Sequence, residues 1–200
     1  MEIVEDKILK STRWLTLVER IYKDMNGEQQ AWVMAQRNND CSAVMIIPIH
    51  YTTHHETPQK RIVVTKEYRV PLGDYEWGFP AGLIDEGESA LSTAHRELKE
   101  ETGLNLDEVT EVSPSVYNTA GMTDEAITMV YGNCSGEISN EFQEASENIE
   151  TFLMAAEEVE ELLKGDHKFG AKAWLILKEF VKIHNITERK YVEDTTATLP

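Results

Sequence analysis

The sequence has few basic residues and little cysteine, and it lacks any long hydrophobic run. Lys and Arg number 19 against 36 Asp and Glu, which gives a formal net charge of −17. A surface so poor in cations argues against nonspecific binding to nucleic acid or to an anionic membrane, because both need positive charge. A small anionic substrate stays compatible with this charge, since a bound metal ion inverts the local field.

The longest apolar stretch, Ala43–Ile49, has the length of a strand, whereas a helix needs ~20 residues to span a bilayer. The N-terminal segment Met1–Lys10 mixes charged and apolar side chains, which is not typical of a signal peptide. Cys41 and Cys134 have no metal-type spacing, and we interpret them as buried thiols, with a disulfide left open. We expect a cytoplasmic protein without membrane or nucleic-acid partners.

The remaining composition is that of a globular protein of 200 residues, with 41% hydrophobic and 28% charged residues. Segments rich in β-branched and aromatic residues alternate irregularly with segments of helical periodicity, which is typical of a mixed α/β or α+β fold. The Asn-Gly pair at 26–27 favours a tight turn within an N-terminal hairpin. Strands are predicted over 13–24, 30–37, 42–50, 61–68, 109–117, 126–134 and 149–155. Helices are predicted over 88–102, 156–164 and 171–184.

The clearest of these helices covers 88–102. We expect Ser89 or Glu88 to cap its first turn, because their side chains accept hydrogen bonds from free N–H groups. Gly103 is expected to end the helix in the left-handed conformation that glycine adopts at low cost. The apolar residues expected to face the core are Leu91, Ala94 and Leu98.

The same helix carries clustered glutamates. Glu97 precedes Glu100 and Glu101 by three and four positions, so the carboxylates share one helix surface and repel each other. A hard cation such as Mg²⁺ makes such a cluster tolerable, because it binds carboxylate oxygens. Arg96 is placed to orient one of them. By themselves the glutamates are also typical of a solvated acidic helix face.

The spacing around this cluster is informative. At fixed intervals within 81–104 stand Gly82, Glu88, Arg96-Glu97-Leu98, Glu100-Glu101 and Gly103-Leu104. This segment resembles the Nudix box of hydrolases that cleave nucleoside diphosphates linked to another moiety. The resemblance implies a Nudix-type α/β/α sandwich with a small N-terminal β subdomain, in which the box forms a loop, a helix and a second loop.

The resemblance also implies a site for Mg²⁺, or for Mn²⁺ in its place. The metal would polarise the pyrophosphate and activate water. Glu88 and Arg96 are expected to brace the loop. The metal ligands that the resemblance implies are Glu97, Glu101, Glu100 and the carbonyl of Ala81.

Outside the box, Tyr68–Gly73 and Phe79–Glu88 resemble the ADP-ribose (ADP-sugar) pyrophosphatase subgroup of this family, and 14–37 resembles its N-terminal hairpin. In that subgroup the N-terminal strands build a homodimer, which we therefore expect here. The implied parts of the chain are a dimerisation subdomain over 1–40, a Nudix hydrolase domain over 41–186 and a loosely ordered tail over 187–200.

Several side chains are implied as substrate contacts. Trp14 and Trp32 match the two tryptophans, one from each subunit, that sandwich the adenine, and such stacking contributes ~1–3 kcal/mol per base. Packing within the sheet is the alternative role for both. Arg37 and Arg69 match cations near the diphosphate and terminal ribose, with surface salt bridges as the alternative. Glu67 stands where related enzymes often carry Gln.

The catalytic base implied by the resemblance lies in the acidic loop before the strand at 149–155. We place it at Glu147, with Glu144 and Glu141 as alternatives. A base has to come within hydrogen-bond distance of the proton that it removes. One position departs from the subgroup, because Ala120 stands where these enzymes usually carry proline.

The predicted function is Mg²⁺-dependent hydrolysis of the pyrophosphate bond of ADP-ribose or a related ADP-sugar. The products would be AMP and a sugar phosphate. An alternative is another nucleoside diphosphate derivative, such as GDP-mannose, NADH or a diadenosine polyphosphate. A second alternative is a sensor that binds ADP-ribose without hydrolysing it.

Overall fold

The computed structural model describes residues 1–38, 42–52, 59–143 and 148–196, and the side chains up to residue 186. The chain divides into two compact units, each assembled from separate stretches of sequence. Unit 1 comprises Met1–Met45, Gly82–Ala94 and Val112–Val130. Unit 2 comprises Ile46–Ala81, His95–Glu111 and Tyr131–Pro200.

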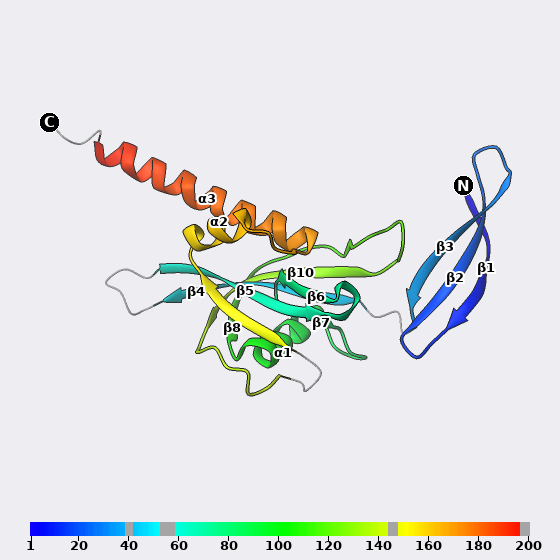
Figure 1. Cartoon of the computed structure of the whole chain (residues 1–200), viewed down its shortest axis with the longest axis horizontal. Coiled ribbons are helices and arrows are strands. Elements are labelled where there is room, and N and C mark those ends of the chain that lie inside the picture. Colours follow the sequence, from blue (N-terminus) through cyan, green and yellow to red (C-terminus); the bar gives the residue numbers. More distant parts are fainter. Residues whose placement is uncertain (39–41, 53–58, 144–147, 197–200) are drawn as a thin grey trace. The chain divides into compact units, whose positions relative to one another are not determined.

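Unit 1 begins with a three-stranded antiparallel sheet, drawn in blue in Figure 1, that consists of β1 (Glu2–Ser11), β2 (Leu15–Lys23) and β3 (Gln29–Arg37). At the turn between β2 and β3, Gly27 has a φ of +81° and donates its N–H to the carbonyl of Asp24. Glycine adopts this conformation without steric cost, so Gly27 allows the tight turn between the two strands. The predicted strands and the turn between them are confirmed.

Strand β1 is the element of this sheet that the sequence pattern does not predict. Its apolar residues stand in adjacent pairs instead of alternating, so the period of a half-buried strand is missing. The strand is exposed along its whole length and pairs with β2. Asp6 and Arg20 join the two strands through an ion pair of 2.7 Å. The hydrogen bond from the Arg20 guanidinium holds the pKa of Asp6 below its ordinary value.

The second sheet consists of the eight remaining strands of the described residues. They are β4 (Ala43–Thr52), β5 (Gln59–Arg69), β6 (Asp74–Gly78), β7 (Ala81–Leu83), β8 (Asn105–Val112), β9 (Val116–Tyr117), β10 (Ala126–Ser135) and β11 (Ile149–Met154). Their order among the described residues is β11-β5-β4-β10-β8, with β6 on β5, β7 on β4 and β9 on β10. The apolar strand β4 is central in this order, as expected. The single strand predicted over 109–117 is wrong: it is two strands, separated at Pro114, which has no N–H for a ladder.

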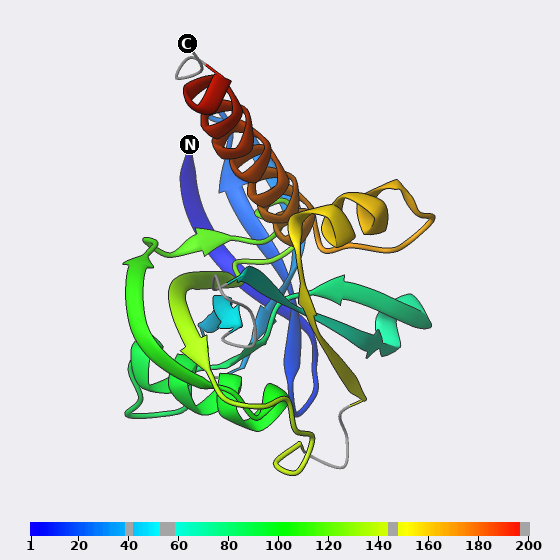
Figure 2. The same ribbon diagram turned by 90° about the vertical axis from the view of Figure 1, so that its left-hand side faces the viewer.

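Three helices lie in the described part of the chain, and their existence is confirmed: α1 (Ala90–Thr102), α2 (Ala156–Lys164) and α3 (Ala171–Thr196). In unit 2, α2 packs against α3 and β11, and α3 packs against β6. Figures 1 and 2 both show α3, in orange to red, continuing well past α2. The predicted end of α3 at residue 184 is wrong, and the segment 187–200 contains its last turns.

The core of unit 2 is aliphatic and includes Ile46, Ile62 and Leu177, each almost completely buried. Burying such a side chain contributes about 1.5–3 kcal/mol. Cys134 is a free, buried thiol, and burial raises its pKa to about 12. This confirms the predicted buried thiol for Cys134, whereas Cys41 lies outside the described residues. No helix in the part of the chain that is described combines the length and the apolar character needed to cross a membrane.

Candidate active site

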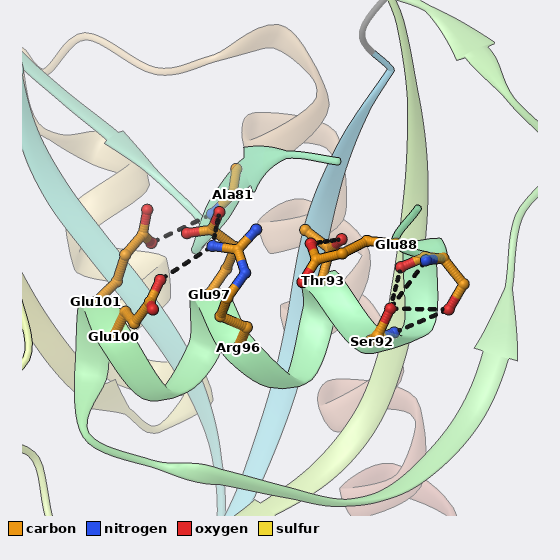
Figure 3. A network of polar contacts seen from close by, with 9 residues as sticks. Ala81, Glu88, Ser92, Thr93, Arg96, Glu97, Glu100 and Glu101 are labelled. Atoms are coloured by element: carbon orange, nitrogen blue, oxygen red, sulfur yellow. Dashed lines mark hydrogen bonds and ion pairs between the residues drawn. The ribbon is translucent and has the colours of Figure 1, made fainter. Parts of the chain in front are cut away.

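The N-terminal end of α1, in unit 1, is capped by the side chains of Ser89 and Ser92. Ser92 donates its N–H to Ser89 Oγ at 3.1 Å, and Ser89 donates its N–H to Ser92 Oγ at 2.9 Å. Ser89 is therefore the cap, one of the two residues expected. The Glu88 carboxylate instead accepts the Thr93 hydroxyl at 2.7 Å, as Figure 3 shows.

One side of α1 is buried, and it contains both apolar and charged residues. Ala94 and Leu98 are completely buried, as predicted, whereas Leu91 is 43% exposed and that prediction is wrong. Leu91 precedes Leu98 by seven residues and therefore lies on the same side of the helix, so its exposure reflects its position in the first turn, where this side is not covered. The remaining buried positions of this face are Thr93, Glu97, Glu101 and Thr102.

The C-terminal half of α1, in unit 2, brings the predicted acidic residues together. Arg96 Nη1 donates to Glu97 Oε1 at 2.8 Å and to Glu100 Oε2 at 3.0 Å (Figure 3). Glu101 Oε2 accepts the main-chain N–H of Ala81 at 3.2 Å. A buried carboxylate is costly unless it is paired and hydrogen-bonded, and these contacts supply partners for both buried glutamates.

The chemistry of this cluster suits a hard divalent cation, because its donors are carboxylate oxygens. Within the described ranges, however, no three His, Cys, Asp or Glu side chains stand close enough to hold a metal ion. The Arg96 guanidinium contacts oxygens of Glu97 and Glu100 that a cation would need, and Ala81 offers its N–H to Glu101. Arg96 contacts one oxygen of each of these two carboxylates, so a metal ion would bind through the second oxygen or displace Arg96.

The helix ends as the sequence predicts. Gly103 has a φ of +77°, and a side chain at this position would meet Ser139, whose Cβ lies 2.7 Å from the place that the new Cβ would take. Ser139 donates its N–H to the Thr102 carbonyl at 2.9 Å. The conformation and the close approach together explain why glycine is needed here.

The two tryptophans predicted to contact the substrate lie in unit 1, and both are exposed, Trp14 by 62% and Trp32 by 51%. Trp32 donates its indole N–H to the carbonyl of Gly121 at 3.0 Å, and the Arg13 guanidinium lies 4.4 Å from the Trp14 ring centre. A pocket of about 390 Å³ opens beside Trp32. Its lining includes Arg20, Tyr22, Trp32, Met34, Ala120 and Asp124.

Both arginines expected near the substrate take part in ion pairs. Arg37 Nε contacts Glu125 Oε1 at 2.5 Å in unit 1. In unit 2, Arg69 contacts Glu67 at 2.7 Å and Glu76 at 3.2 Å. The salt bridges given as the alternative are thus present, and an anionic substrate has to compete with these carboxylates.

The candidates for the catalytic base are only partly described. Glu144 and Glu147 lie outside the described residues. Glu141 is exposed and donates its N–H to Ser139 Oγ at 3.2 Å. Sequence reasoning missed several residues that contact the predicted site residues, among them Glu125 and Gln143. Nothing in the local pattern marks them, because each acts on a residue distant in the sequence.

Comparison with known proteins places this site in a family. The model of the Nudix domain matches residues 51–176, and the chain therefore belongs to the Nudix family. Nudix hydrolases generally use a divalent metal ion.

Individual relatives are consistent with this assignment. An ADP-sugar pyrophosphatase from Mus musculus is 31% identical over 68% of this chain and 62% of its own length. An ADP-ribose pyrophosphatase from Saccharomyces cerevisiae is 34% identical over 64% of this chain and 58% of its own length. The alignments thus span about six tenths of these relatives. The crystal structure of an ADP compounds hydrolase has a TM-score of 0.66 and 22% identity, over 91% of this chain and 94% of that one. This likeness confirms the mixed α/β fold.

Proposed function

We propose that the chain is a Mg²⁺-dependent pyrophosphatase that hydrolyses ADP-ribose or a related ADP-sugar to AMP and a sugar phosphate. The observation that carries the proposal is a pair of carboxylates on α1, Glu97 and Glu101, which are only 8% and 4% exposed within a Nudix box. Grouped carboxylate oxygens are the donors that Mg²⁺ prefers, so this pair favours a hard divalent cation as the ligand. The relatives named as ADP-sugar and ADP-ribose pyrophosphatases support the substrate class.

Within the box, some residues would bind the metal and others would orient the metal ligands. When bound, Mg²⁺ supplies Lewis acidity toward the pyrophosphate and lowers the pKa of water. Glu97 and Glu101 would hold it, with Glu100 and the Ala81 carbonyl contributing. Arg96 would orient Glu97, which it contacts at 2.8 Å. The base that takes the proton from water is proposed to be Glu147.

The substrate's adenine is proposed to stack on Trp32, at the mouth of the pocket in unit 1. Trp14 of a second copy would cover its other face, which makes the enzyme a homodimer through the N-terminal sheet. Exposed apolar residues on β1 support this surface, among them Ile3 and Ile8, which are 59% and 70% exposed. Light scattering would detect the dimer, and a monomer at micromolar concentration would contradict it.

The free Cys134 thiol supports a reducing compartment such as the cytoplasm.

Product analysis tests the catalytic proposal directly. Incubation with ADP-ribose and Mg²⁺ is expected to release AMP and ribose 5-phosphate in equal amounts, and excess chelator is expected to stop the reaction. GDP-mannose, NADH and diadenosine polyphosphates serve as competing substrates. Absence of metal-dependent turnover across the panel would contradict the proposal, and ADP-ribose binding without turnover would favour a sensor.

A further inference from the structure

The C-terminal end of α1 is held by the loop segment 136–143 of unit 2. The last carbonyls of an α-helix have no partner within the helix, so they need donors from elsewhere. The Thr102 carbonyl accepts the N–H of Ser139, as described above. The Gly103 carbonyl accepts Lys99 Nζ at 2.8 Å, and the same ammonium lies 5.4 Å from the Phe142 ring centre.

Gln143 makes the contact closest to the acidic cluster. Its side-chain nitrogen donates to the Glu101 carbonyl at 2.8 Å and to the Ile149 carbonyl at 3.0 Å. An amide nitrogen carries two hydrogens, so one side chain serves both carbonyls at once. Gln143 therefore joins the backbone of Glu101 to the first residue of β11.

These contacts fix Glu101 at both of its ends. Its carboxylate accepts the N–H of Ala81, and its carbonyl is bound by Gln143. The anchor on β11 is rigid, because Ile149 is buried and pairs with Glu67 across the sheet. A buried glutamate held in this way has little freedom to change the direction of its side chain.

We propose that Gln143 is a positioning residue for the metal site, which holds the Glu101 carboxylate in the direction needed for metal binding. The inference rests on the proposed function in one respect, namely that Glu101 is a metal ligand. Residues that orient a metal ligand typically contribute about 10–100-fold to metal affinity or activity. Gln143 acts through the backbone of the ligand, at the Glu101 carbonyl.

Binding of Mn²⁺ alone, followed by electron paramagnetic resonance of the free ion, tests this inference. Gln143→Met keeps the length of the side chain and removes both hydrogen bonds, and Gln143→Asn is too short to reach both carbonyls. The matched control is Asn133→Leu, because the Asn133 amide donates to Glu108 at 2.8 Å and not to α1. We expect Gln143→Met to raise the Kd for Mn²⁺ by about 10-fold or more, Gln143→Asn to raise it less, and the control to leave it unchanged.

Thermal unfolding of the same proteins separates positioning from a merely structural role. A Gln143→Met protein that melts earlier but binds Mn²⁺ within about twofold of wild type would overturn the inference. Wild-type protein that binds no Mn²⁺ would overturn it as well. If Gln143→Met does not fold, the Kd of Gln143→Asn decides in its place. Wild-type protein that binds Mn²⁺ but hydrolyses no ADP-sugar would contradict the proposed function and leave this inference standing.

Discussion

In most proteins charged side chains are exposed and large apolar ones are buried. The C-terminal half of α1 and the N-terminal sheet depart from this rule, each in the opposite way. The helix buries charged side chains, with Glu97 and Glu101 almost inaccessible. The sheet and the connection between β1 and β2 expose large apolar ones, including Ile8, Trp32 and, in the connection, Trp14. Single exposed hydrophobic residues are common, but buried charges and grouped exposed apolar residues are the informative exceptions.

The difference between the two regions indicates the kind of ligand that each one suits. Buried carboxylates are stabilised by a cation, whereas exposed aromatic and aliphatic side chains are stabilised by contact with another flat or apolar surface. A divalent cation offers the first kind of partner, and a nucleobase or a second copy of the chain offers the second. Removing one feature at a time should therefore change different measurements in the two regions.

The largest effect is expected from the buried charge. Glu101→Gln removes a proposed metal ligand while keeping the side chain's volume, so turnover should fall by more than the ~10–100-fold typical of residues that only orient a ligand. Steady-state kinetics of AMP release measures this. Glu161→Gln, at a highly exposed position of α2, should leave turnover unchanged. Wild-type turnover of Glu101→Gln would show that this carboxylate does not bind the metal.

The next largest effect is expected from the exposed aromatic surface. Trp32→Ala should raise KM by about 5- to 150-fold, the equivalent of ~1–3 kcal/mol of stacking, with a smaller change in kcat. The comparison variant is Trp174→Ala, because Trp174 is an exposed tryptophan of α3 that contacts Lys178. An unchanged KM for Trp32→Ala would favour the packing role instead.

A smaller effect is expected where α1 ends. Gly103→Ala places a side chain at positive φ and against Ser139, and such strain costs about 1–3 kcal/mol. Urea unfolding should show this loss in the free energy of unfolding. At Gly78, by contrast, an added Cβ meets nothing within 4 Å, so Gly78→Ala should be close to neutral. Equal stability of the two variants would contradict the strain at Gly103.

The smallest effect is a pH dependence of the N-terminal sheet. The pKa of Asp6 is lowered by Arg20, so the ion pair stabilises the sheet above the unfolded pKa of about 3.9. The contribution is lost as the pH falls through the lowered pKa of the folded state. It should not exceed about 1 kcal/mol, because the pair is exposed. The protection factors of the β1 amides, which compare their hydrogen exchange with the intrinsic rate at each pH, should therefore fall at acid pH, and Asp6→Asn should remove that fall; a protection profile that is the same in the variant would contradict the assignment.

The sequence predicts best those features that depend on neighbouring residues. The hairpin at Gly27, the cap at Ser89 and the end of α1 at Gly103 follow from local conformational preferences, and the structure has each of them. The box glutamates could also be placed on one helix surface from spacing alone. The exposure of Leu91 could not be predicted, because this residue shares the helix face of Leu98 and the period does not show where along the helix that face is covered.

Contacts between distant segments could not be predicted. Strand β1 forms because its backbone pairs with the edge of β2, although its own apolar and polar residues do not alternate. Gln143 meets Glu101 only because the loop folds back on the end of α1. Glu125 meets Arg37 in the same long-range way. A single sequence carries no signal for such pairs, since nothing in either segment alone requires the other.

The hydrogen bond of Trp32 has a consequence for selectivity. An indole has a single polar hydrogen, and here the Gly121 carbonyl takes it. The ring can therefore offer a nucleobase its face but no donor, and every base has a face that stacks. If adenine stacks on Trp32 as proposed, its discrimination from guanine has to come from polar atoms other than the indole, such as those of Arg20 and Asp124 in the pocket lining.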